Sequence, residues 1–395
     1  MRRFLIGLAG GAALGYIAIR TREALAVLRE PPPPAEPDPK AYGALRRSLM
    51  LAGMARSLAT LAFAAYAIGP ALEPADGTVE PRKRRIALVA FGLAGSALLE
   101  VPVDYVEGIA LERRFGLSKQ SDAAWLADYA KGSAVTLAIG VPLIELLAVT
   151  VARAPRLWPL LATAGSLPLL VLANVVAPTF IAPLFNAFDP IEGEFAQEIR
   201  ALAGRYGAGD ATLLRVDMSR QTEKANAYVT GLFGTKRIVI GDTLLDRFEP
   251  RETLFVVAHE LGHYVAGDVW RAVALGVAAS AFVFFGGRRL AESPDKPLGS
   301  VAGLARLIFA VSLLGTLAGP LLSAFSRSRE RAADDFALSA TNDGEGGAAA
   351  FRRLRERNLA EDEQPKWMEL LFSSHPSLGS RIGRLETAPS GRSNS

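Results

Sequence analysis

The segment FVVAHELGHYVAGD holds His259, Glu260 and His263 in the spacing His-Glu-x-x-His. On a helix, residues i and i+4 lie one turn apart on the same face, so both imidazoles can reach one zinc ion. Glu260 points in a neighbouring direction, where its carboxylate can take a proton from a metal-bound water. Zinc lowers the pKa of such a water towards about 7. These residues predict metal-dependent hydrolysis; the alternative is two surface histidines on a helix.

A catalytic zinc site also needs a third protein ligand and one open position. The chain contains 3 histidines and no cysteine, so a thiolate ligand is excluded. The remaining histidine, His375, is far downstream, which favours a carboxylate. The segment SRSRERAADDFA offers Glu330 as the ligand, and Asp334, one helical turn further on, can accept the free N–H of a liganding imidazole. Taken alone, these two residues fit a solvated helix face equally well.

The chain is unusually apolar for a soluble protein: 50% of its residues are hydrophobic and its mean hydropathy is +0.23. Most of its apolar segments reach the ~20 residues that cross a ~30 Å hydrocarbon layer. The segment 271–287 is short, which is also typical of a buried or tilted helix. The segments lie at about 50–72, 86–111, 132–152, 157–186, 271–287 and 302–325.

Short basic runs flank many of these apolar segments. This pattern is typical of membrane-flanking charge rather than of a nucleic-acid surface, and it disfavours the buried helices of a soluble enzyme. Nearly equal numbers of basic residues fall on the two sides, so the positive-inside rule leaves the orientation open. The polar stretches 187–268 and 326–395 are separated by two spans. Both therefore lie on one membrane face and can form one catalytic unit.

The first apolar segment, FLIGLAGGAALGYIAI at 4–19, follows Met-Arg-Arg. It is interpreted as an uncleaved membrane anchor, with a cleaved signal peptide as the alternative. With this segment the chain has up to seven spans. The proline-rich stretch EPPPPAEPDP that follows is predicted to be a surface linker.

Several charged or polar residues fall inside the apolar segments, where a charge that faces lipid costs several kcal/mol. They are expected to face a hydrated cavity or to pair with each other. They are Arg56, Glu100, Asp104, Glu145, Asn174 and Arg306.

Beyond the zinc motif, the chain resembles the M48 metallopeptidases, and specifically the Ste24-type CAAX prenyl protease branch. The resemblance covers most of the chain after residue 40. The matching pieces are ERRFGLSKQ (112–120), APTFIAPLFNAFDP (177–190), TEKANAYVTGLFGTKRIVIGDTLL (222–245), HELGH (259–263), SRSRERAAD (326–334) and SHPSLGSRI (374–382).

The resemblance implies a mainly α-helical, multi-spanning membrane protein whose helices form a ring around a large internal chamber. A small α+β zincin-type unit would carry one Zn²⁺ per chain, facing this chamber. The resemblance also implies that Glu330 is the third ligand beside His259 and His263, and that Asp334 is the partner of a liganding imidazole.

Four further residues take roles from the resemblance. Asn226 and Ala227 are expected beside an edge strand that pairs with the extended substrate backbone, a common way to hold peptides. The alternative for Asn226 is a turn before a strand. His375 could donate to the oxyanion and Arg381 could hold a substrate carboxylate. A helix-capping turn and a structural salt bridge are the respective alternatives.

The predicted domains are an anchor-like segment and linker (1–40), an N-terminal transmembrane domain (41–187), a peptidase domain that includes the last two spans (188–387) and a disordered tail (388–395). The predicted function is that of a zinc metalloendopeptidase in a bacterial inner membrane. It would act on peptides or proteins, lipidated or membrane-associated ones among them, and not on nucleic acid. The alternatives are a membrane quality-control protease of the same family and, more distantly, a transporter.

Overall fold

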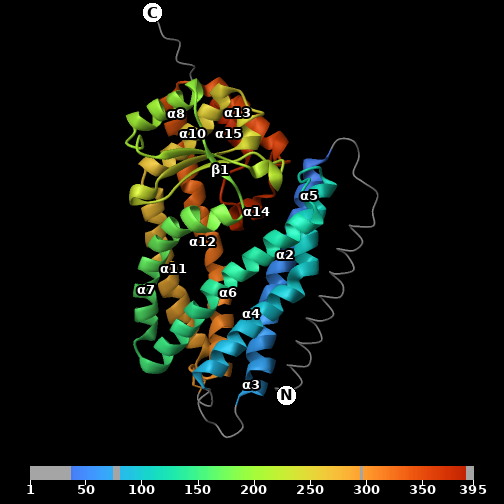
Figure 1. The fold of residues 1–395 in the computed structure, drawn as a ribbon, viewed down its shortest axis with the longest axis vertical. Coiled ribbons are helices and arrows are strands. Elements are labelled where there is room, and N and C mark those ends of the chain that lie inside the picture. The colour runs from blue at the N-terminus through green and yellow to red at the C-terminus, as the bar shows by residue number, and fades with distance from the viewer. Residues whose placement is uncertain (1–36, 74–80, 294–296, 388–395) are drawn as a thin grey trace, which may run out of the picture.

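The computed structural model describes residues 37–73, 81–293 and 297–387, and these residues are mostly helical with one small sheet (Figure 1). The fold class predicted from the sequence is confirmed in this respect. The predicted anchor at 4–19, most of the proline-rich linker and the tail 388–395 lie outside the described residues.

The described residues contain six helical segments that are long and apolar enough to cross a membrane. The short segment at 271–287 extends into a helix of 24 residues, long enough to span the bilayer. All six apolar segments predicted within the described residues are thus confirmed as candidate spans. Their bounds are Pro39–Leu72, Arg82–Arg114, Asp122–Arg153, Trp158–Leu184, Asp268–Ala291 and Val301–Thr341.

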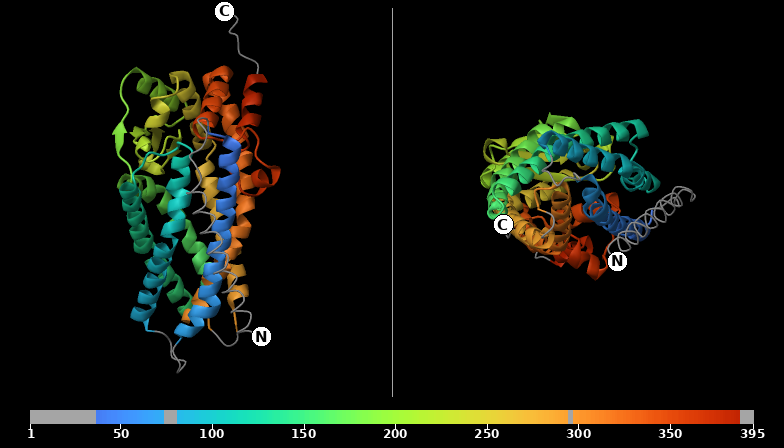
Figure 2. Two further views of the ribbon diagram at one scale, coloured as in Figure 1. Left: turned by 90° about the vertical axis from the view of Figure 1, so that its right-hand side faces the viewer. Right: turned by 90° about the horizontal axis from the view of Figure 1, so that it is seen from below.

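Within these spans, short π-helical turns interrupt the α-helices, so one span can contain two labelled helices. The labelled membrane helices are α2 (Pro39–Phe63), α3 (Gly69–Leu72), α4 (Arg82–Tyr105), α5 (Leu111–Arg114), α6 (Asp122–Arg153), α7 (Trp158–Val176), α11 (Asp268–Ala291) and α12 (Val301–Thr341). They form an elongated bundle, and the remaining elements sit at one end of it (Figure 2).

The elements at that end make a small α+β unit. Its sheet has the order β1-β2-β4-β3, in which β2 and β4 are parallel and the two outer pairings are antiparallel. The strands are β1 (Phe188–Pro190), β2 (Thr212–Val216), β3 (Ala227–Thr230) and β4 (Arg237–Gly241). The helices are α8 (Glu194–Arg205), α9 (Asp242–Leu245), α10 (Pro250–Val265), α13 (Gly344–Arg357), α14 (Lys366–Leu371) and α15 (Leu378–Thr387).

Helix α12 joins the membrane bundle to the α+β unit. It runs for 41 residues without a break, starting at a Ser300 side chain that accepts a hydrogen bond from the Gly303 amide. It ends at Asn342, which adopts a left-handed φ of 51° and caps the helix through the Leu338 carbonyl. At about 1.5 Å per residue such a helix is about 60 Å long, twice the hydrocarbon thickness, so its last turns lie in the α+β unit.

Polar residues inside the spans find partners within the bundle, as predicted for charges that avoid lipid. Arg56 Nε lies 2.7 Å from Glu100 Oε2. Glu145 accepts two hydrogen bonds from the buried Arg85. Asp104 accepts one from the Tyr129 hydroxyl. These contacts link α2 to α4 and α4 to α6.

Helix α10 packs against α12 at Gly262. A Cβ atom built there would lie 3.1 Å from both the Ala333 Cα and the Phe336 ring. Because one of these neighbours is backbone, it cannot move aside without separating the two helices. The glycine therefore sets how closely α10 and α12 approach.

We expect Gly262→Val to destabilise the protein by about 1–3 kcal/mol, because the added atoms overpack this contact. Thermal unfolding in detergent, followed by tryptophan fluorescence, measures the effect. Gly204→Val is the matched control: Gly204 lies on the exposed face of α8, where a Cβ atom meets nothing within 4 Å. Equal shifts in both variants would show that the approach of α10 and α12 is not the cause.

Candidate metal centre

Helix α10 presents His259 and His263 on one face. Pro250 opens the helix, and the Glu249 and Glu252 side chains cap its first turn reciprocally. Phe255 and Leu261 are fully buried in the core of the α+β unit and fix the rotation of the helix. The two imidazole centroids are then 5.0 Å apart.

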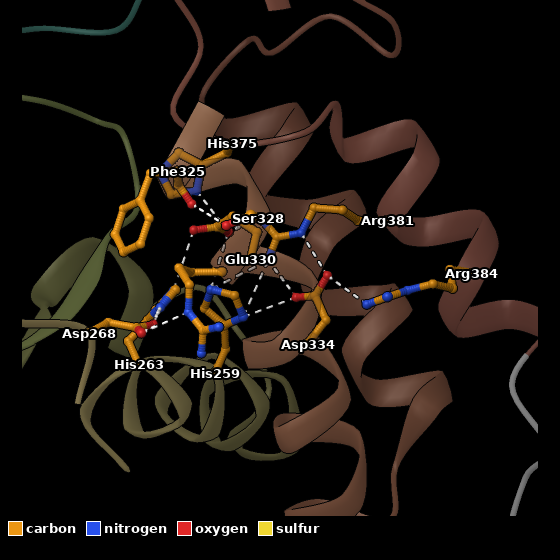
Figure 3. Close-up of polar contacts among 11 residues, drawn as sticks. His259, His263, Asp268, Phe325, Ser328, Glu330, Asp334, His375, Arg381 and Arg384 are labelled. Atoms are coloured by element: carbon orange, nitrogen blue, oxygen red, sulfur yellow. Dashed lines mark hydrogen bonds and ion pairs between the residues drawn. The ribbon is translucent and has the colours of Figure 1, made fainter. Parts of the chain in front are cut away.

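Glu330 of α12 meets both imidazoles (Figure 3). Its Oε2 lies 3.5 Å from His259 Nε2 and its Oε1 lies 3.3 Å from His263 Nε2. Ligand atoms at about 2.0–2.2 Å from a zinc ion in tetrahedral geometry are about 3.3–3.6 Å apart, so the spacing fits such an ion. One ligand atom from each of the three residues lies within 4.8 Å of the others. The structure thus brings the three predicted ligands together in a cluster whose spacing fits a metal ion.

The second nitrogen of each imidazole is held by a carboxylate. His259 Nδ1 lies 2.9 Å from Asp334 Oδ1, and His263 Nδ1 lies 3.0 Å from Asp268 Oδ2. Such contacts leave Nε2 free for a metal and raise its basicity. Both histidines therefore have the donor arrangement of zinc ligands.

The sequence predictions include Asp334 but miss Asp268. Asp268 starts α11, directly after Gly267, whose left-handed φ of 69° turns the chain back towards the site. Arg329 and Arg271 hold its other oxygen at 2.8 and 3.1 Å. The available signal in the sequence was a carboxylate five residues after His263 and directly after Gly267.

Arg381 lies against Asp334, with its Nη2 2.6 Å from Oδ1, and its Nη1 lies 3.3 Å from Glu330. The guanidinium also covers the Phe351 ring, 4.2 Å from the centroid. Arg384 adds a second cation 3.1 Å from Asp334. The salt bridge offered as the alternative role for Arg381 is therefore present, and its buried guanidinium already holds two carboxylates.

Glu260 follows His259 on α10 and is half-buried. Burial raises the pKa of its carboxyl, an effect that the nearby imidazoles of His259 and His263 oppose. A raised pKa brings a carboxylate closer to the range in which it can both accept and return a proton near neutral pH. This environment suits a general base.

The two ligand histidines hold protons firmly when no metal is bound. Burial by itself lowers the pKa of His259, but hydrogen bonds to Asp334 and Glu330 outweigh burial and raise this pKa to about 9. Burial is likewise outweighed at His263, where Glu330 and Asp268 raise the pKa. A metal ion must displace these protons, so metal affinity falls as the pH falls.

His375 lies on the open side of the site. Its Nδ1 is 2.8 Å from Glu330 Oε2, and 59% of its side chain is exposed. The loop that carries it is held to α12, because Arg327 donates to the carbonyl oxygens of Leu370 and Ser373. The imidazole thus stands beside the metal ligands and remains accessible to another molecule.

Asn226 and Ala227 lie where the chain enters β3. This strand is at the edge of the sheet, and it pairs only with β4 among the described strands. Strand β4, the RIVIG segment, is paired on both sides. Asn226 itself is exposed, and its carbonyl accepts a hydrogen bond from the Gly241 amide. Among the described strands, β3 therefore offers one of the two free backbone edges of this sheet, and β1 offers the other.

Two family models match the chain. Residues 191–388 match peptidase family M48, and residues 46–187 match the N-terminal region of CAAX prenyl proteases, described as five membrane helices. Together the two matches cover both the membrane bundle and the metal centre.

Individual relatives agree with these models. The chain is 33% identical to a CAAX prenyl protease 1 homolog of Dictyostelium discoideum, over 63% of this chain and 61% of that protein. It is 29% identical to an uncharacterized metalloprotease of Bacillus subtilis, over 74% and 70%. The crystal structure of S. mikatae Ste24p has the same fold, with a TM-score of 0.73, 23% identity and coverage of 97% and 98%.

We expect Asp268→Asn to weaken zinc binding about 10–100-fold, because His263 loses the carboxylate that orients it. Competition with a chromogenic chelator measures the affinity. Asp335→Asn is the control, since Asp335 lies on the same helix as Glu330 but is exposed and contacts neither histidine within the described residues. Unchanged zinc affinity in Asp268→Asn would mean that the ligand residues and Asp334 are enough to bind zinc without the contact from Asp268.

Proposed function

Because the chain belongs to peptidase family M48 and is a membrane-embedded metallopeptidase, we propose that it hydrolyses peptide bonds with one zinc ion held by His259, His263 and Glu330. The choice of zinc rests on the chemical types of the three ligand side chains and on their spacing. Two imidazoles and one carboxylate, spaced for a tetrahedral ion and with both outer nitrogens hydrogen-bonded, match catalytic zinc sites with one open position.

When bound, zinc supplies a Lewis acid that polarises the scissile carbonyl and makes water a nucleophile at neutral pH. Glu260 accepts the proton of the attacking water and returns it to the leaving amine. Its half-buried position next to His259, and its raised pKa, support both steps. Asp334 and Asp268 keep the two imidazoles oriented throughout, and Arg381 neutralises Asp334.

His375 is proposed to stabilise the charge that develops on the carbonyl oxygen. Its ring stands on the exposed side of Glu330, where a substrate would approach. A hydrogen-bond donor that is already in this position lowers the activation free energy of hydrolysis, because it need not reorganise during the reaction. Arg381 is too deeply engaged with Asp334 and Glu330 to serve as the main anchor for a substrate carboxylate.

The substrate backbone is proposed to add to the free edge of β3. Strand addition satisfies the main-chain groups of an extended peptide whatever its side chains. Asn226 and Ala227 at the start of this edge would contact the peptide. The contacts between α10 and the strands place this edge in the same unit as the metal ligands.

The substrates are proposed to be peptides or proteins associated with the membrane, lipidated ones included. The relatives named as CAAX prenyl proteases support this class. Helix α4 supports a location in the membrane: Phe91, Leu98 and Leu99 are each at least 74% exposed, which suits contact with lipid. We propose that this membrane is a bacterial inner membrane.

We expect Glu260→Gln to lower peptide hydrolysis by a factor of about 10²–10⁴, because the amide cannot accept the water proton. Zinc content, measured by mass spectrometry of the metal, should stay at one per chain because the ligands are intact. Glu356→Gln on exposed α13 is the control. Full activity in Glu260→Gln, or a zinc-free wild-type protein, would overturn the proposed mechanism.

Glu260→Gln should also trap substrates in cells, because the variant still binds them but does not hydrolyse them. Captured peptides identified by mass spectrometry should be enriched in lipidated C-termini if CAAX-like processing is the native role. A broad set of damaged membrane proteins would instead establish quality-control proteolysis.

A further inference from the structure

Helix α11 carries a continuous exposed stripe. Its members recur every three or four residues, the spacing of one helix face. They are Trp270, Ala274, Ala278, Phe282, Phe285 and Arg289. All but the last are apolar, which fits a face in contact with lipid better than a face in contact with water.

The ends of this stripe match the two surfaces of a bilayer. Trp270 and Arg289 are about 28 Å apart along the helix, at 1.5 Å per residue, close to the ~30 Å hydrocarbon thickness. Tryptophan is enriched where a span enters the headgroup region, and arginine flanks the opposite end. Trp270, 48% exposed, therefore marks the membrane surface on the side of the α+β unit.

The turn between β3 and β4 places another aromatic ring at the same level. Phe233 is 63% exposed, and its ring centroid lies 6.0 Å from that of Trp270. The turn is tight, because a Cβ at Gly231 (φ 89°) would be 2.1 Å from the Thr235 carbonyl oxygen. Thr235 Oγ1 closes it through two hydrogen bonds to Leu232, so Phe233 (φ 55°) is turned outward.

A second span holds the same turn. Arg237, just after it, donates to the carbonyl oxygen of Pro178 at 2.8 Å. Pro178 belongs to the end of the span Trp158–Leu184, where Phe180 is 66% exposed. Helices α7 and α11 of these two spans run side by side below the sheet (Figure 1). The turn is thus fixed at the point where two spans leave the membrane.

We propose that the β3–β4 turn, residues 231–235, is a membrane-contacting tip that buries Phe233 at the boundary between lipid headgroups and acyl chains. Its partner is the bilayer itself, because the tip continues the lipid-facing stripe of α11. If β3 binds substrate as proposed above, the tip fixes the distance between that strand and the membrane surface. At about 3.3 Å per residue, Ala227–Thr230 then starts within about 15 Å of the membrane surface.

Spin labels on single cysteines test this tip, since the chain contains no cysteine of its own. The variants are reconstituted in lipid nanodiscs, and the label's accessibility to oxygen, which partitions into lipid, is compared with that to a water-soluble nickel complex. Ala278→Cys on the stripe is the lipid reference. Glu198→Cys on exposed α8, at the far end of the α+β unit, is the water reference (Figure 1).

Phe233→Cys should show an oxygen-to-nickel ratio close to that of Ala278→Cys and well above that of Glu198→Cys. Gly234→Cys repeats the test with a mild change, because a Cβ there meets nothing within 4 Å. A ratio in both tip variants equal to that of Glu198→Cys would overturn the proposal. So would shielding from both reagents, which would show that protein covers the tip.

Discussion

The structure depends on two carboxylates buried on consecutive turns of α12. Glu330 and Asp334 are each 1% exposed, and an isolated buried charge costs several kcal/mol. Their compensation comes from three other segments: His259 and His263 on α10, Arg381 and Arg384 on α15, and His375 in the loop before it. The proposed zinc ion would add a further positive charge beside Glu330. The need to neutralise these two carboxylates therefore draws the proposed metal ligands and their hydrogen-bond partners together.

The membrane bundle also supports the edge strand β3, to which the substrate is proposed to bind. The segment just after α5 holds the loop that leads into β3: the Leu117 carbonyl accepts from the Glu223 amide at 2.8 Å, and Ser118 Oγ donates to the Gln221 carbonyl. Glu112 pairs with Lys224 at 2.8 Å. The N-terminal helices thus position the edge strand, while α12 positions Glu330. The proposed substrate strand and the proposed third ligand both depend on the membrane region.

Much of this could be predicted from the sequence, because the zinc motif and the spans are local patterns. Periodicity alone places His259 and His263 on one face, and length alone marks the six spans. Glu330 needed the family resemblance, since its partner lies 67 residues earlier along the chain. Asp268 was missed because its contact with His263 depends on the left-handed turn at Gly267. From its residue type alone, Arg381 can pair with a substrate carboxylate or with a carboxylate of the protein. Only the contact of α15 with α12 shows that it faces Asp334.

The most direct test of the central claim is X-ray absorption spectroscopy at the zinc edge of the purified protein. We expect one zinc ion per chain, with two imidazole nitrogens and carboxylate or water oxygens at about 2.0–2.2 Å and no sulfur. His375 is the only further histidine in the chain. A spectrum with three imidazoles would therefore make His375 a ligand in place of Glu330 and would overturn the proposed ligand set. Purified protein without stoichiometric zinc would overturn it as well.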